Sequence, residues 1–60
     1  MPVVIVEWWE GRTVEQKKQA AQGITDTLKE LGIPPEATQV VFHDIPRQDW
    51  AIAGRLASEA

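Results

Sequence analysis

Residues 3–18 read VVIVEWWEGRTVEQKK, an apolar run followed by a turn and the start of a helix. The first part, residues 3–9, is apolar apart from Glu7 and rich in β-branched side chains, which is typical of a strand. Because the apolar positions are nearly continuous, we expect both faces of this strand to be covered. Gly11 lies in the turn that ends it.

The sequence marks both ends of the helix that follows. Thr13 is the predicted N-cap, and Gln16 completes a T-x-x-Q capping box. Gly32 and the Pro34-Pro35 pair predict the end of the helix. Between these ends, apolar residues recur on one helical stripe: Val14, Ala21, Ile24, Leu28 and Leu31.

A second apolar run, residues 40–42 with polar flanks, predicts another strand. The connection between the strands contains a helix, so we expect a parallel pair with a right-handed crossover. Residues 44–49 predict a turn, and residues 50–54 (WAIAG) a short strand or hairpin. The predicted fold is therefore α/β, a single β-α-β domain over residues 1–60 with a short C-terminal hairpin or arm.

The size of the chain points to oligomerisation. It has 60 residues, no cysteine and one histidine, which excludes disulfides and disfavours a zinc centre. A domain of this size buries only about 60% of the surface that its unfolded chain exposes, so a monomer is marginal. Two strands and one helix also leave open edges and an uncovered apolar face. We expect further copies of the chain to complete the fold.

Charge and hydropathy exclude other partners. The net charge of −3 provides no basic surface for nucleic acid. No apolar stretch approaches the ~20 residues that span a membrane. The N-terminus lacks the basic start and apolar run of a signal peptide, so a cytoplasmic protein is expected.

Pro2 is the candidate catalytic residue, because removal of Met1 would make its nitrogen the chain terminus. An α-amino group titrates near ~8, and burial in an apolar pocket lowers its pKa further. The resulting unprotonated secondary amine is suited to moving protons on carbon acids. The alternative is that Met-Pro is simply how the chain starts. With Met1 attached, the nitrogen is a tertiary amide without useful basicity.

Arg12 is the candidate carboxylate-binding residue, since its planar fork makes two charge-assisted hydrogen bonds. At ~3.3 Å per residue in a strand, it lies roughly 30 Å from Pro2, so a working pair has to come from different subunits. The alternative for Arg12 is a solvated turn residue. Trp9 and Trp50 are candidates for the apolar wall of the site, or else for core or interface packing. His43 is interpreted as a strand-surface residue.

The chain resembles the 4-oxalocrotonate tautomerase family along essentially its whole length. The resemblance is carried by the N-terminal Met-Pro, an apolar strand, EGRT at residues 10–13, EQK at residues 15–17, and DWAIAG at residues 49–54. It implies β-α-β subunits assembled as a hexamer, a trimer of dimers, without cofactor or metal. It also implies that Pro2 acts as general base and then acid, and that Arg12 binds a substrate carboxylate, or polarises its carbonyl, from a neighbouring subunit. Trp50 would help keep the amine pKa low, and Trp9 would line the apolar pocket.

One position departs from the family pattern. The best-known members carry a second arginine where this chain has Gln39. A glutamine can hydrogen-bond a carbonyl but cannot neutralise a carboxylate, so dicarboxylate binding is expected to weaken. Arg47 and Arg55 are both candidates to substitute for the missing arginine.

These observations predict a homo-oligomeric isomerase, a tautomerase that ketonises small enol or dienol carboxylates. Compounds similar to 2-hydroxymuconate, from the breakdown of aromatic compounds, or to phenylenolpyruvate are the expected substrates. Two alternatives stay open. One is a non-catalytic oligomeric module that binds small acids or scaffolds an assembly. The other is a related hydratase or dehalogenase for unsaturated acids.

Overall fold

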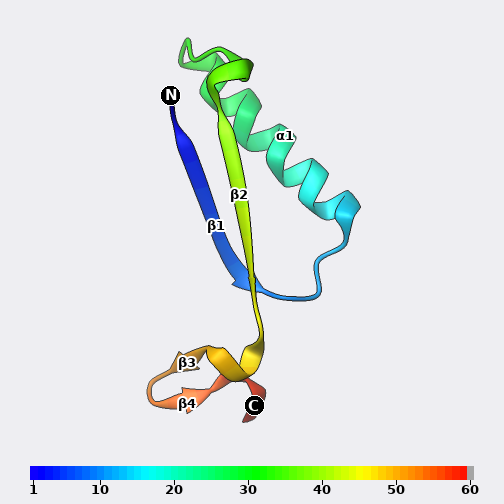
Figure 1. Ribbon diagram of the computed structural model, residues 1–60, viewed down its shortest axis with the longest axis vertical. Coiled ribbons are helices and arrows are strands. Elements are labelled where there is room, and N and C mark those ends of the chain that lie inside the picture. Colours follow the sequence, from blue (N-terminus) through cyan, green and yellow to red (C-terminus); the bar gives the residue numbers. More distant parts are fainter. Residues whose placement is uncertain (60) are drawn as a thin grey trace.

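The computed structural model describes residues 1–59 and contains one β-α-β unit followed by a small hairpin (Figure 1). The strands and the helix, in chain order, are β1 Val3–Trp9, α1 Val14–Glu30, β2 Gln39–Ile45, β3 Ala51–Ile52 and β4 Arg55–Leu56. Short 3₁₀ turns lie before β2, before β3 and after β4, at Pro35–Ala37, Arg47–Asp49 and Ala57–Glu59. Among these described residues, no helix is long and apolar enough to cross a membrane.

The two long strands form a parallel pair, as the sequence predicted. Their register runs from Val3 opposite Gln39 to Trp9 opposite Ile45. Figure 1 shows α1 crossing one side of this pair, while the β3–β4 hairpin extends beyond the C-terminal end of β2. The hairpin lies at the end of the sheet opposite the N-terminus.

The sheet has one covered face and one open face. Alternate residues of β1 and β2 face α1 and are half-buried: Val4, Val6, Trp8, Val40 and Phe42. The opposite face exposes Val3 (52%), Ile5 (63%) and Val41 (48%). No residue in the described part of the chain is buried, so one subunit does not contain a complete core. Apolar surface of this kind has to be covered by another molecule, and the fold is therefore completed by oligomerisation.

Both predicted helix signals are confirmed. The Thr13 hydroxyl accepts a hydrogen bond from the Gln16 backbone N–H (3.1 Å), and the Gln16 side chain accepts one from the Thr13 N–H (3.0 Å). At the other end, Gly32 has a φ of 92° and its N–H bonds to the Lys29 carbonyl, while Ile33 N–H bonds to Leu28. This is the Schellman arrangement, in which the left-handed position favours glycine.

The second strand is longer than predicted. It continues through Asp44 and Ile45, which the sequence had assigned to a turn. These residues pair with Trp8 and Trp9 of β1, and the Ile45 carbonyl also accepts a hydrogen bond from Glu10 N–H (3.0 Å). The strand ends at Ile45, because the next residue is a proline, which has no N–H to donate to a ladder.

The predicted C-terminal hairpin is present. Ala51 pairs with Leu56 and Ile52 with Arg55. The connecting residues Ala53 and Gly54 both have positive φ, 53° and 81°. Two positive φ values are typical of the type I′ turn, whose twist matches that of the flanking strands.

Candidate active site

Pro2 and Gln39 lie together at the start of the parallel pair. The Gln39 backbone N–H donates to the Pro2 carbonyl (3.0 Å), and its side-chain amide lies 3.6 Å from Met1 Sδ. Pro2 is half-buried, whereas Gln39 is exposed. In the full chain the Pro2 nitrogen forms the peptide bond to Met1.

Arg12 lies at the opposite end of the sheet from Pro2. It is in the loop that leaves the end of β1 and leads into α1, which Figure 1 shows at the far end from the N-terminus. The subunit is elongated, with principal extents of 43 × 23 × 14 Å. One subunit therefore does not bring Pro2 and Arg12 together.

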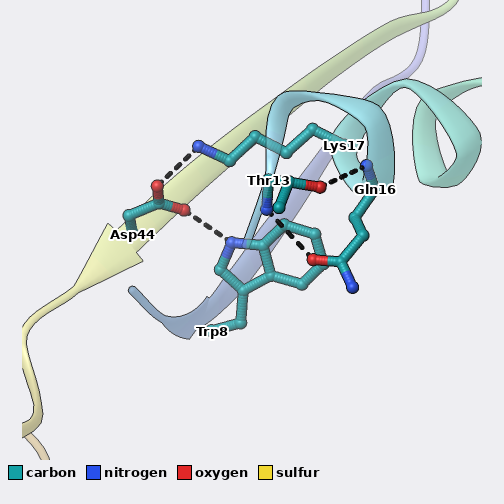
Figure 2. Close-up of polar contacts among 5 residues, drawn as sticks. All are labelled: Trp8, Thr13, Gln16, Lys17 and Asp44. Atoms are coloured by element: carbon teal, nitrogen blue, oxygen red, sulfur yellow. Dashed lines mark hydrogen bonds and ion pairs between the residues drawn. The ribbon is translucent and has the colours of Figure 1, made fainter. Parts of the chain in front are cut away.

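Four side chains hold the surroundings of Arg12 in place. The Arg12 guanidinium lies over the Trp8 ring, 5.6 Å from its centroid. Trp8 stacks in turn on Phe42 of β2, with centroids 5.1 Å apart and an interplanar angle of 14°. Trp8 Nε1 donates to Asp44 Oδ1 at 2.6 Å, and Lys17 Nζ donates to Asp44 Oδ2 at 2.6 Å (Figure 2).

The hydrogen bond and ion pair with Lys17, followed by the hydrogen bond from Trp8, hold the pKa of Asp44 below its ordinary value. The side chains of Lys17 and Asp44 are only 30% and 33% exposed, so solvent screens this pair less than a free surface pair. This network was not predicted from the sequence. The only available signal was the parallel register, which sets Trp8 opposite Asp44.

Trp9 and Trp50 contact each other next to Arg12. Their rings meet edge to face, with centroids 6.1 Å apart and an interplanar angle of 89°. The guanidinium of Arg47 covers the Trp9 ring, 5.0 Å from its centroid. Trp9 Nε1–H is shielded from solvent and has no acceptor among the described residues. An unpaired buried donor costs about 1–3 kcal/mol, so an acceptor from another molecule is favoured here.

Two cavities meet at Arg12 and Trp9. One, of about 210 Å³, is lined by Trp9, Glu10, Gly11, Arg12 and Arg47. The other, of about 250 Å³, is lined by Glu7, Trp8, Trp9, Arg12 and Trp50. A third hollow, of about 450 Å³, is lined by Glu10, Pro46, Arg47, Gln48 and Ser58. It shares Glu10 and Arg47 with the first cavity, and its lining includes neither Arg12 nor a tryptophan.

The candidate residues thus form two half-sites at opposite ends of the parallel strand pair. The N-terminal half-site contains Pro2 and Gln39, and the distal half-site contains Arg12, Trp9 and Trp50. Removal of Met1 would give the first half-site an amine, and an amine opposite a cation with an apolar wall would suit an acid whose carbon chain gains or loses a proton.

His43 lies outside both half-sites. It is exposed on the open face of the sheet, where its Nδ1 is 3.1 Å from Glu7 Oε1. The two residues are partners in the parallel register. The interpretation of His43 as a strand-surface residue is consistent with this position.

Comparison with known proteins defines the family. The chain matches the family described as "Tautomerase enzyme" over residues 2–60. It is 48% identical over 60 residues to a "Probable tautomerase" of Ralstonia nicotianae, covering 98% of this chain and 92% of the relative. It is 40% identical over 60 residues to the 2-hydroxymuconate tautomerase of Comamonas testosteroni, covering 98% and 95% of the two chains.

A solved structure supports the same assignment. A structure from work on the 4-oxalocrotonate tautomerase isozymes of Methylibium petroleiphilum matches with a TM-score of 0.88 at 36% identity, covering 95% of this chain and 94% of that one. The chain belongs to the 4-oxalocrotonate tautomerase family. Membership supports tautomerase activity, and hence an isomerase, and does not favour the non-catalytic or hydratase alternatives.

Proposed function

We propose that this chain is a homo-oligomeric tautomerase that ketonises small enol or dienol carboxylates without a cofactor. Removal of Met1 frees the Pro2 nitrogen, which takes a proton from the enol oxygen and returns one to carbon. Substrates similar to 2-hydroxymuconate and to phenylenolpyruvate both fit this chemistry, because each joins an enol to a carboxylate. The expected cytoplasmic location belongs to the same proposal.

The roles of the other residues follow from their surroundings. Arg12 binds a substrate carboxylate, since its guanidinium is held against Trp8 and lines two cavities. Trp9 and Trp50 supply the apolar wall that keeps the Pro2 amine unprotonated. Gln39 is bonded to the Pro2 carbonyl and provides an amide that can donate to a substrate carbonyl.

The separation of Pro2 from Arg12 is the observation that supports a site shared between subunits. Pro2 precedes the start of β1 and Arg12 follows its end, so the base and its cation meet only when a second copy is present. The open sheet face requires such copies independently of catalysis. A hexamer arranged as a trimer of dimers satisfies both requirements, and is the assembly we propose.

Subunit mixing tests this function directly. Pro2→Ala should lower kcat sharply with phenylenolpyruvate, and Arg12→Ala should mainly raise KM, with the assembly intact in both. The two variants are unfolded together, refolded and assayed at a substrate concentration far below the KM of Arg12→Ala, where each alone is nearly inactive. Random assembly gives roughly a quarter of the sites both native residues. Recovery of about that fraction of wild-type turnover is the expected result.

The controls separate the possible failures. Each variant refolded alone should stay nearly inactive at this low substrate concentration, and the intact mass of the wild type should show that Met1 is absent. Unchanged turnover in Pro2→Ala would remove the proline from the mechanism. No recovery in the mixture, with mixed assemblies verified by mass, would place the whole site within one subunit.

A further inference from the structure

A second arginine shares the distal half-site with Arg12. Arg47, from the turn after β2, lines the same 210 Å³ cavity as Arg12, Trp9 and Gly11. The two arginines come from connections that follow different strands, and the parallel pairing of β1 and β2 brings these connections to one end of the sheet. The cavity thus has two cations on its lining.

Each guanidinium is supported by an indole ring. Arg12 lies 5.6 Å from the centroid of Trp8, and Arg47 lies 5.0 Å from the centroid of Trp9. A guanidinium held next to an aromatic face can still use its planar fork of N–H donors to bind a carboxylate. Two supported forks next to one cavity can therefore bind two carboxylate groups.

The part of the cavity that one subunit provides is small. Its volume of about 210 Å³ lies below the ~300 Å³ at which pockets for drug-sized ligands begin, which accords with a short-chain acid. Glu10 also lines the cavity and adds a negative charge beside the two arginines. The two arginines and Glu10 together give the cavity a net charge of about +1. The preference for a substrate with two carboxylates must therefore come from direct hydrogen bonds to the arginines and not from the net charge.

Arg55 does not share this arrangement. It lines a different cavity, of about 240 Å³, with Trp9, Ile52, Leu56 and Ala57, whose surface is mainly apolar and does not include Arg12. Of the two arginines that the sequence offered in place of the family arginine at Gln39, only Arg47 lies beside Arg12.

We propose that Arg47 is a specificity-determining residue, which pairs with Arg12 to bind the second carboxylate of a short dicarboxylate substrate. Arg47 thereby supplies, from the distal half-site, the charge that Gln39 lacks. This inference deepens the proposed function and rests on it for the statement that the substrate is an enol. The preference for two carboxylates can be measured by binding alone, without turnover.

Equilibrium binding of two unreactive probes tests the proposal. Muconate is a six-carbon diene with a carboxylate at each end, and sorbate is a six-carbon diene with only one. Titration of the intact assembly in phosphate-free buffer, monitored by tryptophan fluorescence and calorimetry, gives both Kd values.

Wild type should bind muconate more tightly than sorbate. Arg47→Gln should raise the muconate Kd about ten- to hundredfold, the effect of losing one charge-assisted contact, and change the sorbate Kd by no more than about twofold.

Two further variants complete the test. Arg55→Gln removes the same charge from the neighbouring cavity and should leave both Kd values unchanged. Glu10→Gln should tighten muconate binding, because it removes a repulsive charge from the cavity that contains both arginines. Equal binding of the two probes by wild type, or the same loss in Arg55→Gln as in Arg47→Gln, would overturn the proposal. If the probes behave as expected but no enol is turned over, the proposed function fails and the dicarboxylate site stands.

Discussion

At the scale of single residues, Asp44 connects the helix to the residue that supports Arg12. Its carboxylate accepts from Trp8 Nε1 and from Lys17 Nζ, both at 2.6 Å. Trp8 in turn lies beneath the Arg12 guanidinium. Ionised Asp44 therefore fixes the indole on which the candidate carboxylate-binding residue rests.

This network makes stability depend on pH in a defined direction. The pKa of Asp44 is lowered from 3.8, first by the hydrogen bond with Lys17, so the folded state favours the ionised form. The stabilisation is complete above the ordinary pKa and is lost as the pH falls through the lowered one. Asp44→Asn should thus lower Tm at neutral pH, and the gap from wild type should close below about pH 4.

Thermal unfolding between about pH 3 and 7, at fixed protein concentration, measures this gap. Lys17→Met should remove most of the pH dependence contributed by Asp44, because Lys17 is the largest cause of the shift. A gap between Asp44→Asn and wild type that stays constant over the whole range would show that the carboxylate charge does not matter.

At the scale of elements, sequence signals succeed where the interaction is local. The capping box of Thr13 and Gln16 joins residues within one turn, and both of its hydrogen bonds are present. The strand boundary at Asp44 was wrong because its pairing with Trp8 depends on register between distant segments. The contacts of Arg12 with Trp8 and of Arg47 with Trp9 were not predicted, because they depend on how the chain turns after each strand.

The capping box also gives an element-scale prediction, since it begins α1 directly after Arg12. Thr13→Ala removes the hydroxyl that accepts the Gln16 N–H, and should lower the free energy of unfolding by about 1 kcal/mol per subunit. Thr27→Ala is the matched control. The Thr27 hydroxyl donates back to the Gly23 carbonyl within the helix, and alanine has the higher helix propensity.

Urea unfolding at one protein concentration compares the two variants. Thr27→Ala should leave stability unchanged or raise it slightly, while Thr13→Ala lowers it. Equal losses in both would mean that α1 is stabilised by packing alone and that its N-terminal cap contributes nothing.

At the scale of the whole molecule, the open sheet face links assembly to catalysis. Val3, Ile5 and Val41 form an apolar surface on the side away from α1. The same face carries the Glu7–His43 pair at 3.1 Å, toward the end of the sheet where Arg12 lies. We propose that one assembly has both effects: it covers this face with other subunits, and it brings Pro2 of one subunit to Arg12 of another.

Ile5→Glu should therefore abolish both properties together. The residue is 63% exposed in one subunit, and a carboxylate buried there in the assembly costs several kcal/mol unless it is paired. Light scattering should show a fall in mass below the wild-type assembly, with turnover lost in proportion to the dissociated fraction. Val14→Glu is the control, because Val14 is equally apolar and 70% exposed but lies in the first turn of α1, where an acidic residue is favourable. If Ile5→Glu dissociates the assembly and the separated subunits still catalyse ketonisation, a single chain contains a working site and the shared-site proposal is wrong.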